Sequence, residues 1–128
     1  VKKQASLFCT LPEIKEYMAL VTKSVGLLLD LGHLNISSNI LKFKRQKFLD
    51  DYLDEFGSRL FEIHISENDG LRDQHLPLTN NSWELDVLKE INSIPLYDGS
   101  ERIYCLEARK ADKKELRKSL DLINSICA

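Results

Sequence analysis

The segment from Arg59 to His75 reads RLFEIHISENDGLRDQH, and the rest of the chain is organised around it. It opens as an apolar strand that stops on His64, and a polar loop follows. It closes on Asp73 and His75, a carboxylate and an imidazole two residues apart. An apolar strand that ends on a ligand-type residue and leads into a ligand-bearing loop is typical of the catalytic rim of a β/α enzyme.

The same layout is repeated on either side of this stretch. An apolar run from Val25 to Leu29 stops on Asp30, with His33 three residues later. A third strand, from Ile103 to Leu106, ends on Glu107. Strands that alternate with helices predict a parallel sheet. In such folds the chemistry lies at the carboxyl ends of the strands, so Asp30, His64 and Glu107 are expected to converge.

The remaining segments are expected to be helices and loops. Two capping boxes, Thr10 to Glu13 and Asp112 to Glu115, predict helix starts. The helices are expected to run from Pro12 to near Ser24, from Phe43 to Phe56, from Trp83 to Ile91 with Asn81 or Ser82 as the cap, and from Asp112 to about Cys127. Asn35 to Asn39 is expected to be a polar loop. The first strand is apolar throughout, which predicts burial of both its faces.

Composition favours an ordinary cytoplasmic domain. The 128 residues are 43% hydrophobic and 30% charged, which is typical of one globular domain with its own core. The longest apolar run is far too short to cross a membrane, and the start shows no signal peptide. The three cysteines, Cys9, Cys105 and Cys127, fit neither a disulfide framework nor a CxxC zinc pattern, and we interpret them as reduced thiols.

Charge argues against a nucleic-acid partner. The formal net charge is −2, which gives no support for non-specific binding to a polyanion. A basic run, Lys42 to Lys47, is either a phosphate or nucleic-acid patch or the solvated first turn of a helix, and the second interpretation is favoured.

Oxygen ligands with one imidazole suit a divalent ion such as Mn²⁺, Mg²⁺, Co²⁺ or Zn²⁺. Such an ion polarises a substrate carbonyl and stabilises an enediolate. Two nearby histidines, His33 and His75, and the carboxylate of Asp73 would add ligands, orient substrate or bind a second ion.

Each ligand candidate also has a purely structural interpretation. Asp30 can be a helix cap or turn residue, and His64 can be a structural histidine with its hydrogen bonds satisfied. Glu107 can be a surface group paired with Arg109 or Lys110. The joint site is favoured because all three histidines of the chain fall in the segments proposed to form it.

Four segments carry a family resemblance. LLLDLGH (27–33), EIHISENDG (62–70), DQHLPL (73–78) and YCLEAR (104–109) resemble the xylose-isomerase-like TIM-barrel superfamily, which includes sugar isomerases and epimerases and the endonuclease IV type of DNA-repair enzymes. The resemblance implies that residues 1–128 form a single partial domain, the C-terminal part of a (β/α)₈ barrel with about strands six to eight. The strand-five glutamate of the family, a metal ligand and catalytic base in the epimerases, would precede Val1.

The resemblance also implies roles for individual residues. Asp30, His64 and Glu107 resemble three of the four ligands of the single-metal epimerase site, and Glu107 resembles the catalytic carboxylate that shuttles the proton. His33 resembles a residue that contacts substrate in the epimerases and binds metal in the endonucleases. Asp73 and His75 resemble the endonuclease metal pair, although many sugar-enzyme relatives share the same spacing.

The loop beyond this pair leaves the choice between the branches open. Many relatives have a glycine-rich stretch there, whereas this chain has Leu78 to Ser82. The polar loop with Asn68 and Asp69, together with Arg109 after the third strand, completes the expected sugar-binding set.

Three functions follow from these observations. The first is a metal-dependent sugar or sugar-phosphate isomerase or epimerase, active as part of a complete barrel. The second is an abasic-site endonuclease with a multinuclear zinc site. The third is an inactive fragment that forms homo-oligomers, because a partial barrel exposes two strand edges and an apolar surface. The isolated chain is expected to be inactive and to pair with another copy or with the rest of a barrel.

Overall fold

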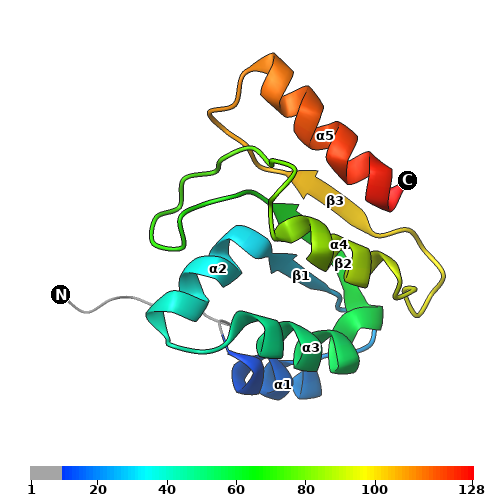
Figure 1. Ribbon diagram of the computed structural model, residues 1–128. Helices are drawn as coiled ribbons and strands as arrows, with labels where there is room; N and C mark the ends of the chain where they lie inside the picture. The colour runs from blue at the N-terminus through cyan, green and yellow to red at the C-terminus, as the bar shows by residue number, and fades with distance from the viewer. Residues whose placement is uncertain (1–9) are drawn as a thin grey trace.

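The computed structural model describes residues 10–128, so Cys9 lies outside the described residues. Its centre is a parallel sheet of three strands, β1 (Leu27–Asp30), β2 (Leu60–Ile65) and β3 (Ile103–Leu106), in the order β1-β2-β3. Asp30 is paired with His64, and His64 with Cys105. The three arrowheads in Figure 1 therefore point the same way and lie beside one another at the same end of the sheet. This confirms the predicted parallel α/β arrangement.

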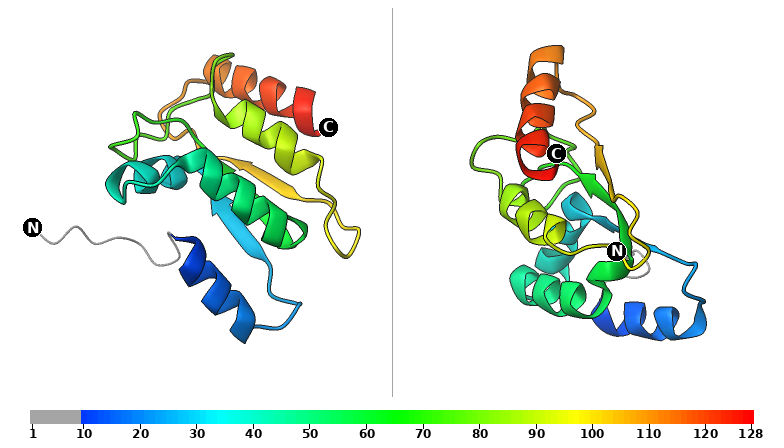
Figure 2. Two further views of the ribbon diagram at one scale, coloured as in Figure 1. Left: turned by 60° about the horizontal axis from the view of Figure 1, so that its bottom comes forward. Right: turned by 90° about the vertical axis from the view of Figure 1, so that its right-hand side faces the viewer.

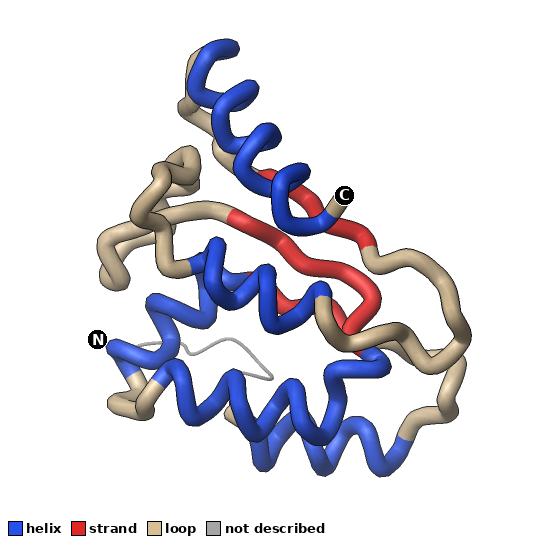
Figure 3. The backbone as a smooth tube through the Cα atoms, turned by 45° about the vertical axis from the view of Figure 1, so that its right-hand side comes forward, coloured by secondary structure: helices blue, strands red, loops and turns tan. Residues whose placement is uncertain are grey.

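The helices lie between the strands along the chain and at both ends of the described residues, and they cover one face of the sheet. They are α1 (Leu11–Leu20), α2 (Leu31–Ile40), α3 (Arg45–Phe56), α4 (Glu84–Asn92) and α5 (Lys113–Cys127), and a short 3₁₀ turn, η1 (Gly57–Arg59), follows α3. The edge-on view in Figure 2 and the tube in Figure 3 show α3, α4 and α5 on the same side of the strands. The sheet therefore has one face beneath helices and one face that they leave open.

Both predicted capping boxes are present. In α1 the Thr10 N–H donates to the Glu13 carboxylate at 3.3 Å. In α5 the Asp112 N–H donates to Glu115, and the Glu115 N–H donates back to Asp112, both at 2.8 Å. These reciprocal bonds satisfy backbone donors that a helix start leaves unpaired, which is why short sequence patterns located both starts.

The core lies between the sheet and the helices. Alternate strand residues, Leu29, Ile63 and Ile65, are buried toward the helices, as the two-residue period of a strand requires. Helix α3 contributes one continuous stripe at helical spacing, consisting of Phe48, Leu49, Tyr52, Leu53 and Phe56. Burial of side chains of this size contributes about 1.5–3 kcal/mol each.

The opposite face of the sheet is open. Leu28, Glu62 and Ile103 lie side by side in the register, and the exposed fractions of Leu28 and Ile103 are 47% and 59%. The prediction that the first strand is buried on both faces is therefore wrong at Leu28. Among residues 10–128 the helices cover only the other face, so the open face is where side chains remain accessible.

Helix α2 corrects the prediction of a polar loop from Asn35 to Asn39. The Asp30 carboxylate caps this helix by accepting a hydrogen bond from the His33 N–H at 2.8 Å. Asn35 and Ser38 occupy inward positions of the helix and are buried. Polar residues on the inward side hid the helical repeat in the sequence. As a result, His33 lies in the first turn of α2, next to Asp30.

The start of α4 corrects a second prediction. The cap position is Trp83, with no capping bond from its side chain, rather than Asn81 or Ser82. The Ser82 hydroxyl instead accepts from the Thr79 N–H at 2.8 Å and donates to the Glu67 carboxylate. Ser82 therefore holds the loop between β2 and α4 rather than the helix.

A buried serine fastens this same loop to α5. The Ser119 side chain is fully buried, and its hydroxyl accepts a hydrogen bond from the Leu78 N–H at 3.0 Å. Replacing Ser119 with alanine leaves a buried donor unpaired, so we expect the free energy of unfolding to fall by about 1–3 kcal/mol. Chemical denaturation measures the loss. The exposed Ser125→Ala variant in the same helix is the control, and an equal loss in both variants would rule out this anchor.

Candidate metal centre

Three ligand-type side chains converge at the carboxyl ends of the strands. Asp30 is the last residue of β1, His64 is near the end of β2, and Glu107 directly follows β3. One ligand atom from each lies within 4.8 Å of the other two, and all three residues are half-buried. Parallel pairing in register produces this convergence, because it aligns the strand ends at one edge of the sheet.

The His64 ring lies between two carboxylates. Its Nε2 is 2.7 Å from Glu62 Oε1, and its Nδ1 is 3.7 Å from Glu107 Oε1. A proton on Nε2 would be donated to Glu62, which would leave the Nδ1 lone pair directed toward the cluster. Ligating histidines are commonly oriented by a second carboxylate in this way. Sequence reasoning missed Glu62, although it precedes His64 by two residues and thus shares its face of the strand.

Asp30 has two roles at once. One oxygen caps α2 through the His33 N–H, and the other, Oδ2, lies 3.2 Å from the His33 ring Nδ1. The structural interpretation of Asp30 as a helix cap is therefore correct. Capping does not prevent Asp30 from binding a metal ion, because one carboxylate oxygen reaches the helix backbone and the other faces the cluster.

The remaining predicted ligands form a second group that adjoins the first. Asp73 Oδ2 lies 3.0 Å from His75 Nε2 and 3.4 Å from His33 Nε2. His75 is buried with a left-handed backbone, φ 50°, and its Nδ1 lies 3.9 Å from Glu107 Oε2. The structure thus brings all six sequence-predicted metal residues into one continuous cluster.

The two histidines of this group affect the pKa of the Asp73 carboxyl group. Burial disfavours its charged form, but hydrogen bonds to the His33 and His75 rings outweigh burial and lower the pKa of Asp73 below its ordinary value. Asp73 is therefore poised as an anion.

Oxygen atoms surround the histidines of the cluster on both sides. His33 faces Asp30 and Asp73 through its two ring nitrogens, and His75 faces Asp73 and the Glu107 carbonyl, the latter at 3.0 Å. A neutral ring carries one N–H, so its second nitrogen directs a lone pair at an acceptor. A metal ion bound between the ring nitrogen and the oxygen would remove this repulsion. The arrangement therefore suits a metal ion.

The predicted sugar-binding residues are engaged within the protein. The Asn68 side chain bonds to α2 and to its own loop. Asp69 accepts hydrogen bonds from the backbone and guanidinium of Arg72 and from the Leu71 N–H, which lower the pKa of Asp69 to about 2. Arg109 lies two residues after Glu107 and is exposed. Asn68 and Asp69 thus shape the loop.

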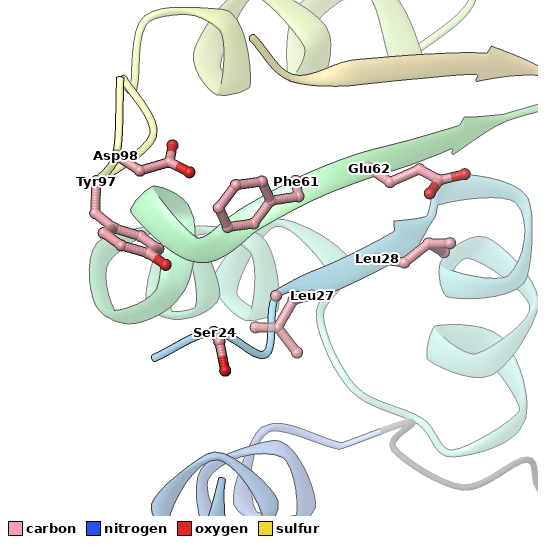
Figure 4. A pocket seen from close by; sticks show the side chains of 8 residues that line it. Ser24, Leu27, Leu28, Phe61, Glu62, Tyr97 and Asp98 are labelled. Atoms are coloured by element: carbon pink, nitrogen blue, oxygen red, sulfur yellow. The ribbon is translucent and has the colours of Figure 1, made fainter. Parts of the chain in front are cut away.

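The open face also carries a hollow at the opposite ends of the strands. Figure 4 shows Phe61 facing Tyr97, with Leu28 and Glu62 farther along the strands. The Phe61 and Tyr97 rings meet edge to face, with centroids 5.8 Å apart. Glu62 lines this hollow and also bonds to His64. Glu62 therefore lies between the hollow on the open face and the polar cluster at the strand ends.

Comparisons with known proteins identify one distant relative. No family model matches the chain, and no solved structure matches it. The chain is 27% identical over 106 residues to the uncharacterized protein MJ1311 of Methanocaldococcus jannaschii, covering 80% of this chain and 34% of that protein. The chain thus spans about a third of the length of this relative. In the described residues, no helix combines the length and the apolar character needed to cross a membrane.

Proposed function

We propose that the chain supplies about strands six to eight of a TIM barrel that acts as a metal-dependent sugar or sugar-phosphate isomerase or epimerase. The observation that carries the proposal is the convergence of Asp30, His64 and Glu107 within 4.8 Å at three adjacent strand ends. Two carboxylates and an imidazole fit Mn²⁺, Mg²⁺, Co²⁺ or Zn²⁺. A divalent ion held there would supply Lewis-acid stabilisation of a developing enediolate.

The protein groups have separate tasks in this proposal. Glu107 would help to hold the ion, and its carboxylate takes a proton from one carbon of the sugar and returns it to the neighbouring carbon. His33 reaches the substrate, since its side chain is 58% exposed at the edge of the cluster. Glu62 orients the His64 ring from behind. Asn68 and Asp69 hold the loop, and Arg109 is free to meet a polar or anionic part of the sugar.

A second candidate function is abasic-site cleavage by a multinuclear zinc site. The specific observation in its favour is the contact of the group His33, Asp73 and His75 with Asp30 and Glu107. Six ligand-type residues in one cluster suit more than one ion. The net charge of −2 argues against it, because DNA-binding surfaces are usually basic.

A third candidate is an inactive fragment that pairs with another copy. The open sheet face, with exposed Leu28 and Ile103, supports it, as do the unpaired edges of β1 and β3 in the described residues. The same surfaces suit the remaining strands of a barrel.

Solvent exchange at the substrate carbon tests the first function. In a complete barrel that carries this chain, we expect Mn²⁺- or Co²⁺-dependent exchange of deuterium from D₂O into a ketose next to its carbonyl. Glu107→Gln should reduce that exchange by about 10²–10⁴-fold, the usual contribution of a proton-transferring group. The isolated chain should show none. Cleavage of abasic DNA without sugar exchange would instead support the second function.

A further inference from the structure

A network of amide groups lies behind the cluster and joins α2 to the loop after β2. Asn68 Oδ1 accepts from Asn35 Nδ2 at 2.9 Å and from the Gly70 N–H at 2.8 Å. Asn68 Nδ2 donates to the Gly32 carbonyl at 2.9 Å. One side chain thus bonds to α2 at two points and to its own loop at a third.

A second layer holds this network in place. The buried Asn35 accepts a hydrogen bond from the Arg45 guanidinium, which lies over the Trp83 ring at 3.6 Å from its centroid. Arg45 belongs to the basic run that was expected to be solvated, and at Arg45 that expectation is wrong. Its partners are Asn35 and the aromatic face of Trp83, so it braces α3 and the start of α4 against α2.

Two glycines permit the close approach of the loop to α2. A Cβ on Gly32 would lie 2.6 Å from Ser66 Oγ. Gly70 has φ +77°, and a Cβ there would lie 2.2 Å from Asn39 Nδ2, the group that donates to the Gly70 carbonyl at 2.9 Å. A side chain at either glycine would collide with its neighbours, so the chain has glycine at both points, and amide hydrogen bonds hold the loop and the helix together.

We propose that Asn68, supported by Asn35 and Arg45, is the positioning residue that sets the distance between the His33 side of the cluster and the Asp73–His75 segment. Gly32 directly precedes His33, and Gly70 precedes Asp73 by three residues. Hydrogen bonds at these two glycines therefore fix the backbone on each side of the 3.4 Å contact between His33 and Asp73. The effect on metal binding rests on the proposed metal function, whereas the effect on geometry does not.

The test compares Asn68→Ala with Asn80→Ala, an exposed asparagine in the same loop. In the metal-free chain, nuclear Overhauser contacts between the His33 ring and residues 73–75 should be present in the wild type and in Asn80→Ala, and lost in Asn68→Ala. Asn68→Ala should bind Co²⁺ about 10–100-fold more weakly than the wild type, which is the usual loss when a residue that supports a metal ligand is removed. The visible absorption spectrum of the bound cobalt should also change.

The two measurements separate the two hypotheses. A wild-type chain that takes up no Co²⁺ counts against the metal function. The nuclear Overhauser contacts then decide by themselves whether Asn68 positions His33 beside residues 73–75. The inference is overturned if Asn68→Ala retains those contacts. It is also overturned if the wild type binds cobalt and Asn68→Ala shows the same affinity and spectrum. If Asn68→Ala fails to fold, Asn35→Ala removes one of the three hydrogen bonds of Asn68 together with the partner of Arg45, and it should weaken the same contacts. Contacts of unchanged intensity in that variant would overturn the inference.

Discussion

Replacing His64 with alanine is expected to reduce the affinity of the chain for a divalent ion by more than about 100-fold, beyond the 10–100-fold typical for the loss of an outer-shell partner. Asp30, His64 and Glu107 form the central group of the cluster. His64 supplies its nitrogen ligand, and the two carboxylates supply oxygen ligands. Isothermal titration with Co²⁺ or Zn²⁺ measures the loss.

Two matched variants make this result specific. Glu62→Gln removes only the charge that orients the His64 ring, so it should weaken binding by about tenfold. Asp30→Asn retains the oxygen that caps α2 but loses the ligand charge, so it should weaken metal binding while the free energy of unfolding changes little. Wild-type affinity in His64→Ala would show that Asp30, His64 and Glu107 do not bind the ion.

Glu84→Gln is expected to remove a pH dependence of stability of about 3 kcal/mol. The Glu84 side chain is fully buried in α4. Burial raises the pKa of Glu84 from 4.5 to about 7, the nearby Glu67 adds to the rise, and Arg45 opposes it. The folded chain therefore holds this proton more tightly than the unfolded chain does.

The sign of the effect follows from proton linkage. Below pH 4.5 both states are protonated, and Glu84 contributes nothing. Between pH 4.5 and about 7 the unfolded chain ionises first, so the free energy of unfolding falls by about 1.4 kcal/mol per pH unit, or about 3 kcal/mol over the interval. Above pH 7 the loss is complete and constant.

Urea denaturation at several pH values measures this dependence. The difference in stability between Glu84→Gln and the wild type should move by about 3 kcal/mol in favour of the variant from pH 4.5 to pH 7.5. The exposed Glu90→Gln variant of the same helix is the control and should follow the wild-type curve. Parallel curves for Glu84→Gln and the wild type would show that Glu84 ionises normally in the folded chain.

Local patterns predicted the sheet and the central group well. A strand reverses its side chains at each residue, and parallel pairing aligns the carboxyl ends, so strands ending on Asp30, His64 and Glu107 were expected to bring these groups together. The capping boxes placed α1 and α5 in the same way, because their partners lie three residues apart. These features depend on neighbours in sequence or on a regular period.

The features that sequence reasoning missed depend on distant partners. Helix α2 was hidden because Asn35 and Ser38 are buried, and Asn35 is stabilised there by Asn68 and Arg45. Arg45 resembles the other exposed cations of its run until Trp83 is known to lie beneath it. Burial of Glu84, likewise, follows only from tertiary packing. Polar residues in inward positions carry no signal in a hydrophobic pattern.

The metal content of the chain after dialysis against Co²⁺, measured by mass spectrometry beside that of His64→Ala, tests whether the three strand ends bind an ion. We expect about one tightly held ion per chain at Asp30, His64 and Glu107, and none in the variant. A wild-type chain without bound cobalt, or a variant that retains it, would contradict the claim that these three strand ends form a metal centre.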